Sequence, residues 1–344
     1  TNSQVLAENY PFATIAPNVG VVEVPDERME EIVKLFHPLR TIYTTFEFTD
    51  IAGLVKGASK GEGLGNRFLA NIRETDAMIH VVRCFADPDI EHVEGTLDPV
   101  RDMEEINLEL CLADLETVET RISKVFRKAQ TKEKDAAMEM ETLQKLKTAL
   151  ASGMPVRLID LSDRDQQAVR NYALLTAKPV IYVANMGEEE IGAPEKNEYY
   201  KAVKEFAEKE KSACIAICAR IEEELSGLEK EEKRAFLDDL GIETSGLEQI
   251  IKAAYHLLGL RTFFTVGKPE CRAWTFRQGM KAPQCAGVIH TDFEKGFIRA
   301  EVYSYADLMM YHTEQALKEN GKIRLEGKEY VMQDGDIVFF RFNV

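Results

Sequence analysis

The sequence predicts an α/β protein whose mostly parallel sheet is interrupted by a helical insertion and followed by a smaller α+β module. Strand-like and helical patterns alternate over residues 1–102 and again over 176–260, which is typical of parallel sheets covered by helices on both faces. Between these stretches, 103–150 contains no glycine or proline and has the apolar periodicity of long helices. From 261 to 344 the chain offers short strands separated by turn residues. We therefore predict three parts: 1–102 with 176–260, 103–175, and 261–344.

The α/β part contains four runs with the character of buried strands. They are short, apolar and rich in β-branched and aromatic residues, whereas the stretches that separate them are amphipathic. In chain order, the predicted elements are the strand "TTFEF" (44–48), the helix "GNRFLANIRETD" (65–76), the strands "AMIHVVRCF" (77–85) and "KPVIYVANM" (178–186), the helix "NEYYKAVKEFAEKEK" (197–211) and the strand "ACIAICA" (213–219).

The sequence of the insertion predicts two long amphipathic helices that run antiparallel and form a helical hairpin. Apolar residues recur at helical spacing, and the polar segment "AQTKEKDA" predicts the turn between the two helices. Gly153 and Pro155 end the second helix. The apolar positions are Ile106, Leu110, Ala113, Val118, Ile122 and Val125, followed by Met140, Leu143, Leu146 and Leu150.

A basic cluster lies around the predicted tip of this hairpin. Its six cations are opposed only by Glu133, so the local charge is six minus one, or +5. On an acidic protein such a cluster is a candidate contact with RNA or another polyanion, and a solvated helix tip is an equal alternative. The cations are Arg121, Lys124, Arg127, Lys128, Lys132 and Lys134.

The C-terminal part predicts a small, mostly antiparallel module. Its strand-like segments are "RTFFTV", "CRAWTF", "FIRAEVY", "KEYVM" and "DIVFFRFNV", with turn signals such as "EGKE" and "QDGD" between them.

The composition excludes several classes of protein. A net charge of −16 disfavours indiscriminate coating of nucleic acid, and we expect no sequence-specific DNA binding. No apolar run approaches the ~20 residues that span a bilayer, so we expect no membrane contact. The six cysteines are scattered, which favours buried free thiols and a cytoplasmic location.

The segment after the first predicted strand contains Asp-x-x-Gly, formed by Asp50 and Gly53. At the end of a strand, the carboxylate would bind Mg²⁺ through water, and the glycine N–H would approach a γ-phosphate. Thr14, in "NYPFATIAPNVG", is a candidate for a further magnesium ligand from a closing loop, although an ordinary loop residue is the default interpretation of this threonine alone. Ras-like GTPases place Gln after this motif to orient the attacking water, whereas this chain has Leu54, which has no hydrogen-bonding group.

A second motif, Asn185-Met186-Gly187-Glu188, follows another predicted strand. The end of a parallel strand is where open α/β sheets bind nucleotides. GTPases have Asn-Lys-x-Asp here, and the Asp accepts hydrogen bonds from guanine. The replacement of Lys by Met and of Asp by Glu predicts weak guanine selectivity. Taken alone, the motif favours a simpler interpretation, a strand followed by an acidic loop.

The phosphate-binding loop that should accompany these motifs, G-x-x-x-x-G-K-[ST], does not occur among the 344 residues. Residue 1 is Thr rather than Met. We therefore expect that the loop and a first strand, about twenty residues, precede the given sequence.

Taken together, the motifs resemble the YchF, or Obg-like ATPase, family over essentially the whole chain. The resemblance rests on "NYPFATIAPNVG", "DIAGLVKGASKGEGLGNRFL", "NMGE" and "MKAPQCAGVIHTDFEKGFIRAEV", which occur in the family's order. It implies a P-loop NTPase domain with an inserted helical hairpin and a C-terminal β-grasp (TGS-like) domain. It also implies a phosphate loop G-x-x-N-V-G-K-S-T in preceding residues.

The resemblance further implies an activity and its residues. The family prefers ATP to GTP, uses Mg²⁺, and associates with the ribosome, which would be contacted by the basic hairpin tip and the TGS-like domain. The base would be read near Asn185, Met186 and Glu188, with Ala219 in a third motif that departs from the usual Ser-Ala-Lys. His92 would assist hydrolysis in place of the missing Gln, although a surface histidine without a role is an equal alternative.

Three hypotheses follow. The first is a cytoplasmic ATPase that acts as a nucleotide-dependent switch in translation or stress response. The second is a ribosome-binding or protein-binding adaptor that does not hydrolyse nucleotide and has an incomplete site. The third, disfavoured by Asn-Met-Gly-Glu, is a GTPase.

Overall fold

A computed structural model describes residues 18–51, 64–88, 90, 92, 95–130 and 134–343. Three residues of the predicted nucleotide site, Thr14, Gly53 and Leu54, lie outside these ranges. The chain folds into two compact units. Unit 1 comprises Thr1–Gly20 and Thr49–Ile250, and unit 2 comprises Val21–Phe48 and Ile251–Val344.

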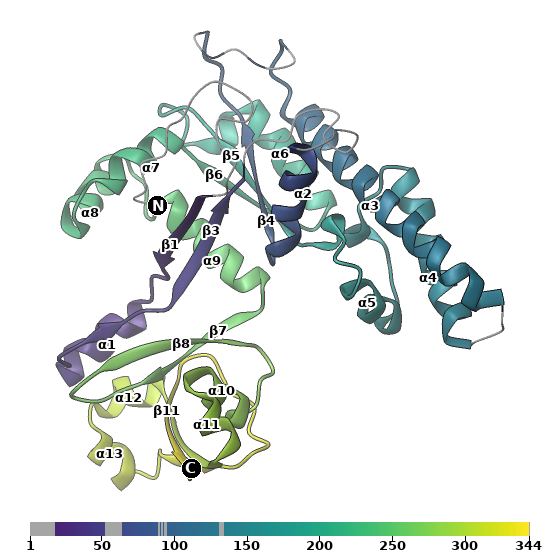
Figure 1. Ribbon diagram of the computed structural model, residues 1–344. Coiled ribbons are helices and arrows are strands. Elements are labelled where there is room, and N and C mark those ends of the chain that lie inside the picture. Colours follow the sequence, from purple (N-terminus) through teal and green to yellow (C-terminus); the bar gives the residue numbers. More distant parts are fainter. Residues whose placement is uncertain are drawn as a thin grey trace. The chain divides into compact units, whose positions relative to one another are not determined.

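Unit 1 is built on a parallel sheet of β4 (Met78–Arg83), β5 (Val180–Asn185) and β6 (Ala213–Ile217), with β5 in the middle (Figure 1). The first five residues of β5 are buried, as expected of a central parallel strand. α6 (Glu198–Lys209) connects β5 with β6 and packs Val203 and Ala207 against the sheet. The predicted parallel sheet is therefore present among the described residues.

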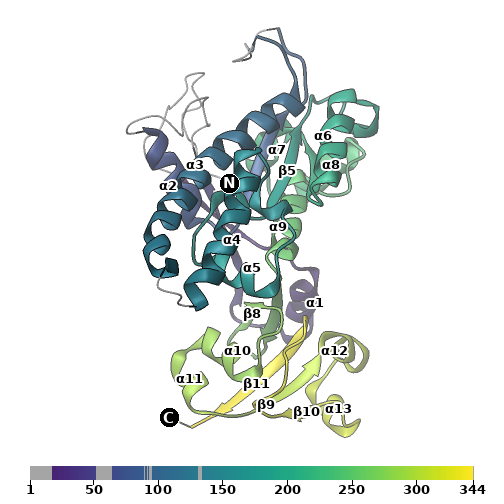
Figure 2. The same cartoon turned by 90° about the vertical axis from the view of Figure 1, so that its right-hand side faces the viewer.

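The two long helices of the insertion are α3 (Pro99–Gln130) and α4 (Lys134–Ala151), which run side by side (Figures 1 and 2). Their shared core contains Val118 and Val125 from α3 with Leu143, Leu146 and Leu150 from α4. These are positions that the helical periodicity singled out. The short elements that return the chain to β5 are η1 (Val156–Leu158), α5 (Asp163–Arg170) and η2 (Leu175–Ala177).

The remaining helices of unit 1 flank the sheet or follow it. α2 (Leu64–Glu74) precedes β4, and η3 (Pro194–Lys196) precedes α6. α7 (Ala219–Ser226) follows β6 directly, α8 (Lys230–Asp239) comes next, and α9 (Gly246–Leu257) begins in this unit, which ends at Ile250. α9 begins against β6, because a Cβ at Gly246 would lie 2.4 Å from Ile217 Cγ2. Glu222 of α7 accepts hydrogen bonds from Gly246 N and Leu247 N, which satisfies two donors at the start of α9.

Unit 2 is built on a six-stranded sheet in the order β10-β9-β11-β7-β8-β2. β11 runs parallel to β7 and β2 parallel to β8, and the other pairs are antiparallel. The strands are β2 (Thr41–Ile42), β7 (Leu260–Thr265), β8 (Cys271–Arg277), β9 (Phe297–Ser304), β10 (Arg324–Glu326) and β11 (Asp336–Phe342), and the helices are α1 (Glu27–Phe36), α10 (Ala282–Ile289), α11 (Thr291–Lys295), α12 (Tyr305–Tyr311) and α13 (Glu314–Glu319).

Two features of unit 2 differ from the sequence prediction. The segment "KEYVM" forms only an isolated bridge at Val331, and the edge strand is β10 instead. Residues 21–48, assigned above to the first part, belong to the C-terminal part, because β2 pairs with β8 and α1 buries Met29 and Ile32 beside Phe264. β1 (Asn18–Glu23) pairs with β3 (Thr45–Asp50) in a separate two-stranded sheet.

Candidate functional site

The carboxyl ends of β4, β5 and β6 form one edge of the parallel sheet. Arg83, the last residue of β4, is in register with Asn185 at the end of β5, and Asn185 is in register with Ile217 at the end of β6. In open α/β sheets, ligands bind outside this edge. The segments that follow the three strands are therefore the candidate site.

Asn185 joins the end of β5 to the start of α7. Its Oδ1 accepts a hydrogen bond from Ala219 N at 3.0 Å. Cys218, the N-cap residue of α7, makes no side-chain capping bond, so Asn185 satisfies a donor that would otherwise lack a partner in the helix. Met186 is only 2% exposed, and its N–H donates to Ile217 O at 2.7 Å. The structure thus brings together three of the predicted nucleotide-binding residues.

Glu188 is bound by a cation that the sequence analysis did not single out as its partner. Its Oε1 lies 2.8 Å from Arg220 Nε, and the two side chains are 45% and 74% exposed. GTPases recognise guanine with the carboxylate at this position. In this protein, that carboxylate forms an ion pair with an arginine of the same chain. Because Arg220 lies 32 residues away on α7, only the pairing of β5 with β6 places it here.

The loop after β4 is held by Arg83, which sequence reasoning missed. Its guanidinium donates to the carbonyl oxygens of Phe85, Asp87 and Ile90 at 3.0–3.2 Å and lies 4.8 Å from the centre of the Phe85 ring. An arginine with planar, multiply directed donors is suited to fixing an irregular loop in this way. The loop that leads toward His92 thus starts from a fixed position.

His92 is paired with a carboxylate on α3. Its Nε2 lies 2.9 Å from Asp102 Oδ2, and the side chains are 17% and 24% exposed. Arg101 donates to the other oxygen of Asp102 at 3.0 Å and to Thr96. A carboxylate bonded to one ring nitrogen fixes the orientation of an imidazole. By contrast, His80 lies within β4, and burial, with a contribution from Arg157, lowers its pKa to about 4, so it is neutral.

Of the predicted magnesium ligands, only Asp50 lies within the described residues. It is the exposed last residue of β3. Within the described ranges, no group of three or more His, Cys, Asp or Glu could hold a metal ion. Magnesium bound to nucleotides needs no such group, since one or two carboxylates, water and phosphate oxygens suffice. An isolated carboxylate at a strand end fits that chemistry.

The six cysteines are free thiols, five of them buried, as predicted. Burial raises the pKa of Cys84 and of Cys285 to about 12, so both are protonated. No helix in the described part of the chain is long and apolar enough to cross a membrane.

Comparison with known proteins decides the family. Residues 1–114 match MMR_HSR1, described as 50S ribosome-binding GTPase, and residues 260–343 match YchF-GTPase_C, described as a protein of unknown function. The chain is 56% identical to the ribosome-binding ATPase YchF of Bacillus subtilis over 344 residues, which is all of this chain and 94% of that protein. It is 49% identical to the protein of the same name from Escherichia coli O157:H7, with the same coverage. The chain belongs to the YchF family.

Solved structures agree with YchF membership. The YchF GTPase of Schizosaccharomyces pombe is 41% identical, with a TM-score of 0.85 over 97% of this chain and 90% of that one. A GTP binding protein from Pyrococcus horikoshii OT3, 19% identical with a TM-score of 0.60, shares the fold. The P-loop GTPase fold predicted from the sequence is thereby confirmed.

Proposed function

We propose that the chain is a ribosome-associated ATPase that hydrolyses ATP to ADP and phosphate with Mg²⁺ and acts as a nucleotide-dependent switch in translation or stress response. The curated relatives are named ribosome-binding ATPases, and one matching family is described as a ribosome-binding GTPase. A ribosome-associated protein of this kind would act in the cytoplasm.

The ion pair between Glu188 and Arg220 is the observation that favours ATP over GTP. The relatives carry both names, since the Schizosaccharomyces pombe protein is called a GTPase. Guanine recognition needs a carboxylate that accepts from the base, and in this structure Glu188 Oε1 forms an ion pair with Arg220 Nε at 2.8 Å, so a guanine would compete with Arg220 for this carboxylate. Met186, in the place of the usual lysine, is buried and has no charge. Adenine would be read by backbone groups near Met186.

The other residues take their roles from this site. Asn185 and Ala219 would border the base, and the Gly53 N–H would approach the γ-phosphate. Thr14 and, through water, Asp50 would hold Mg²⁺, which would neutralise phosphate charge. His92, oriented by Asp102 at 2.9 Å, positions the attacking water that Leu54 has no group to bind.

Ribosome contact would come from the basic cluster and the C-terminal TGS-like domain. α3 ends at Gln130 and α4 begins at Lys134, so Arg127, Lys128 and Lys134 belong to the helix ends nearest the connection. Arg121 lies on α3 farther from this connection. It forms an ion pair with Glu139 at 2.7 Å, which reduces the positive charge that it offers to a partner.

The test measures phosphate release from ATP and from GTP, with and without ribosomes, in parallel with sedimentation of the protein with ribosomes. We expect magnesium-dependent ATP hydrolysis, a lower rate with GTP, and salt-sensitive ribosome binding. Arg127→Glu with Lys128→Glu should weaken sedimentation, whereas Lys201→Glu and Lys209→Glu on α6 should not. Ribosome binding without nucleotide binding would instead support the adaptor hypothesis, and preferred hydrolysis of GTP would contradict the assignment of ATP.

A further inference from the structure

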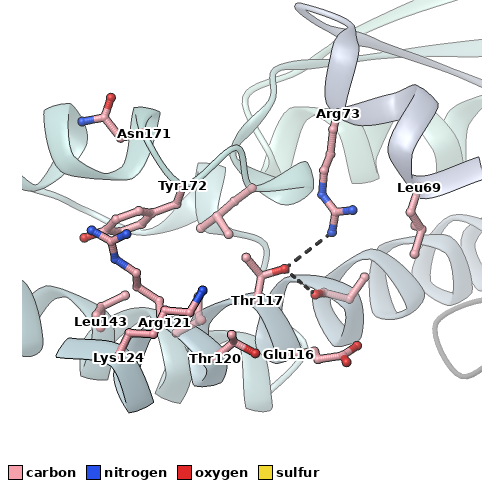
Figure 3. A pocket seen from close by; sticks show the side chains of 13 residues that line it. Leu69, Arg73, Glu116, Thr117, Thr120, Arg121, Lys124, Leu143, Asn171 and Tyr172 are labelled. Atoms are coloured by element: carbon pink, nitrogen blue, oxygen red, sulfur yellow. Dashed lines mark hydrogen bonds between the residues drawn. The ribbon is translucent and has the colours of Figure 1, made fainter. Parts of the chain in front are cut away.

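A cavity lies away from the sheet edge, within unit 1. It has a volume of about 480 Å³ and is formed by α2, α3, α4 and the residues that follow α5 (Figure 3). A cavity of this size is typical of sites for small molecules. None of its lining residues belongs to the candidate nucleotide site. They are Leu69, Arg73, Ala113, Glu116, Thr117, Val118, Thr120, Arg121, Lys124, Leu143, Asn171, Tyr172 and Leu174.

The charge of the cavity is opposite to that of the protein. Among the described residues that line it, Arg73, Arg121 and Lys124 are opposed by one carboxylate, Glu116, in a chain whose net charge is −16. Arg121 is bound to Glu139, which leaves Arg73 and Lys124 as the lining cations available to a ligand. A concave surface with cations on an acidic protein favours an anion locally.

Arg73 is the strongest candidate to bind that anion. Figure 3 shows it reaching from α2 toward Thr117 of α3, where Nη2 lies 3.5 Å from Oγ1, the far limit of a hydrogen bond. Nearby Asp114 is fully buried, but its oxygens accept from Leu175 N, Thr176 N and Thr176 Oγ1 at 2.7–2.9 Å. The planar donors of Arg73 are therefore largely available, and such donors match phosphate oxygens two at a time.

The opposite side of the cavity offers a surface for a flat group. Figure 3 shows Arg121 beside Tyr172, and the guanidinium carbon lies 5.4 Å from the ring centre. Tyr172 OH donates to Glu139 at 3.1 Å, which fixes the ring, and burial raises its pKa to about 12. Apolar side chains form much of the remaining wall, and Thr120 and Asn171 add polar groups. They include Leu69, Ala113, Val118, Leu143 and Leu174.

We propose that this cavity binds a small phosphate monoester with a flat ring, such as a nucleoside monophosphate or an aryl phosphate. The phosphate lies against Arg73, and the ring lies beside Tyr172 and Arg121. Lys124 adds a favourable charge at the rim. The site is distinct from the sheet edge, and its existence does not depend on whether the chain hydrolyses ATP.

The test uses methyl-labelled full-length protein titrated with phenyl phosphate, AMP and inorganic phosphate and observed by NMR. We expect phenyl phosphate to shift the methyl signals of Leu69, Val118, Leu143 and Leu174, and to bind about tenfold more tightly than inorganic phosphate because its ring is buried. Similar affinities for phenyl phosphate and AMP would identify aryl monoesters in general, and much tighter binding of AMP would identify nucleoside monophosphates.

Variants decide whether the named residues form the site. Arg73→Gln should weaken phenyl phosphate binding about tenfold or more, because a charge-assisted pair is lost. Thr120→Phe, which fills the cavity, should abolish the shifts while the rest of the spectrum stays native-like. Lys201→Gln removes the same charge from exposed α6 and should change affinity less than about twofold. Unchanged affinity in Arg73→Gln, shifts confined to other methyl groups, or no shifts at millimolar probe would overturn the proposal.

Discussion

Two ion pairs associated with β5 lie in opposite surroundings. Arg157 and Glu210 are 2.7 Å apart with side chains only 8% and 7% exposed, and Tyr182 of β5 donates to the same Glu210 oxygen at 2.8 Å. Arg220 and Glu188, beyond the end of β5, are 2.8 Å apart but 74% and 45% exposed. The two N–O distances are similar, but the pairs differ in access to water and in further hydrogen bonds, since Tyr182 and Asn107 also donate to Glu210.

The difference in exposure distinguishes an ion pair that stabilises the fold from one whose charges can bind a ligand. Asn107 of α3 joins the buried pair, so the network connects α3, β5 and the end of α6 in a medium of low dielectric. Breaking it would leave a buried charge without its partner. The exposed pair can exchange its partner for water or a ligand at little cost. His92 and Asp102, at 17% and 24% exposure, lie between these extremes.

The largest expected effect is on the buried pair. Arg157→Ala should lower the free energy of unfolding of unit 1 by about 3–5 kcal/mol, because Glu210 is left buried and unpaired. Urea denaturation followed by far-ultraviolet circular dichroism measures it, since α3 and α4 belong to this unit. Glu188→Gln is the matched control and should lose no more than about 1 kcal/mol. Equal losses of unfolding free energy in the two variants would show that burial does not decide how much each ion pair stabilises the fold.

The intermediate pair should affect catalysis rather than stability. If His92 positions water, His92→Ala lowers kcat for ATP by about 10²-fold with little change in KM. Asp102→Asn should give a smaller loss, because it alters only the orientation of the ring. His290→Ala changes an exposed histidine that is also close to an aspartate, and should leave the rate unchanged. Full activity in His92→Ala would mean that this histidine has no catalytic role.

The effect of pH on stability tests the surroundings of His80, which lies in β4. The pKa of His80 is lowered from 6.5 to about 4 in the folded protein, so below pH 6.5 the unfolded chain binds more protons. The free energy of unfolding should therefore fall as the pH falls from 6.5 to about 4, with a contribution from His80 of about 1–3 kcal/mol. The free energy of unfolding of His80→Leu, obtained from denaturation curves at several pH values, should depend less steeply on pH over this interval. The same dependence on pH in both proteins would contradict the lowered pKa.

The smallest expected effect is at the exposed pair. Arg220→Ala frees the Glu188 carboxylate and should tighten GTP binding about threefold relative to ATP. Competition for a fluorescent ATP analogue measures the ratio, with Arg220→Lys as the variant that retains the charge. A ratio that does not change would show that Arg220 does not limit guanine recognition.

Much of the fold could be predicted because its signals are local. The strands of the parallel sheet and the two long helices follow from apolar runs and from helical spacing, and the structure confirms both. The strand "KEYVM" could not be judged in this way, because a short alternating segment becomes a strand only when a partner edge is available to it. The pairing of β2 with β8 likewise joins residues about 230 positions apart and leaves no local pattern.

The candidate site shows the same division. Sequence motifs alone selected Asn185, Met186 and Glu188, because the end of a parallel strand is a recognisable place for a ligand. Tertiary structure alone supplied the partners of the site residues, Arg220 for Glu188 and Asp102 for His92. Side-chain types and periodicity are properties of one segment, whereas burial and pairing depend on which distant segments meet. The sequence therefore determined the family and the chemistry available to it, and only the fold decided which charges are buried, paired or free to act.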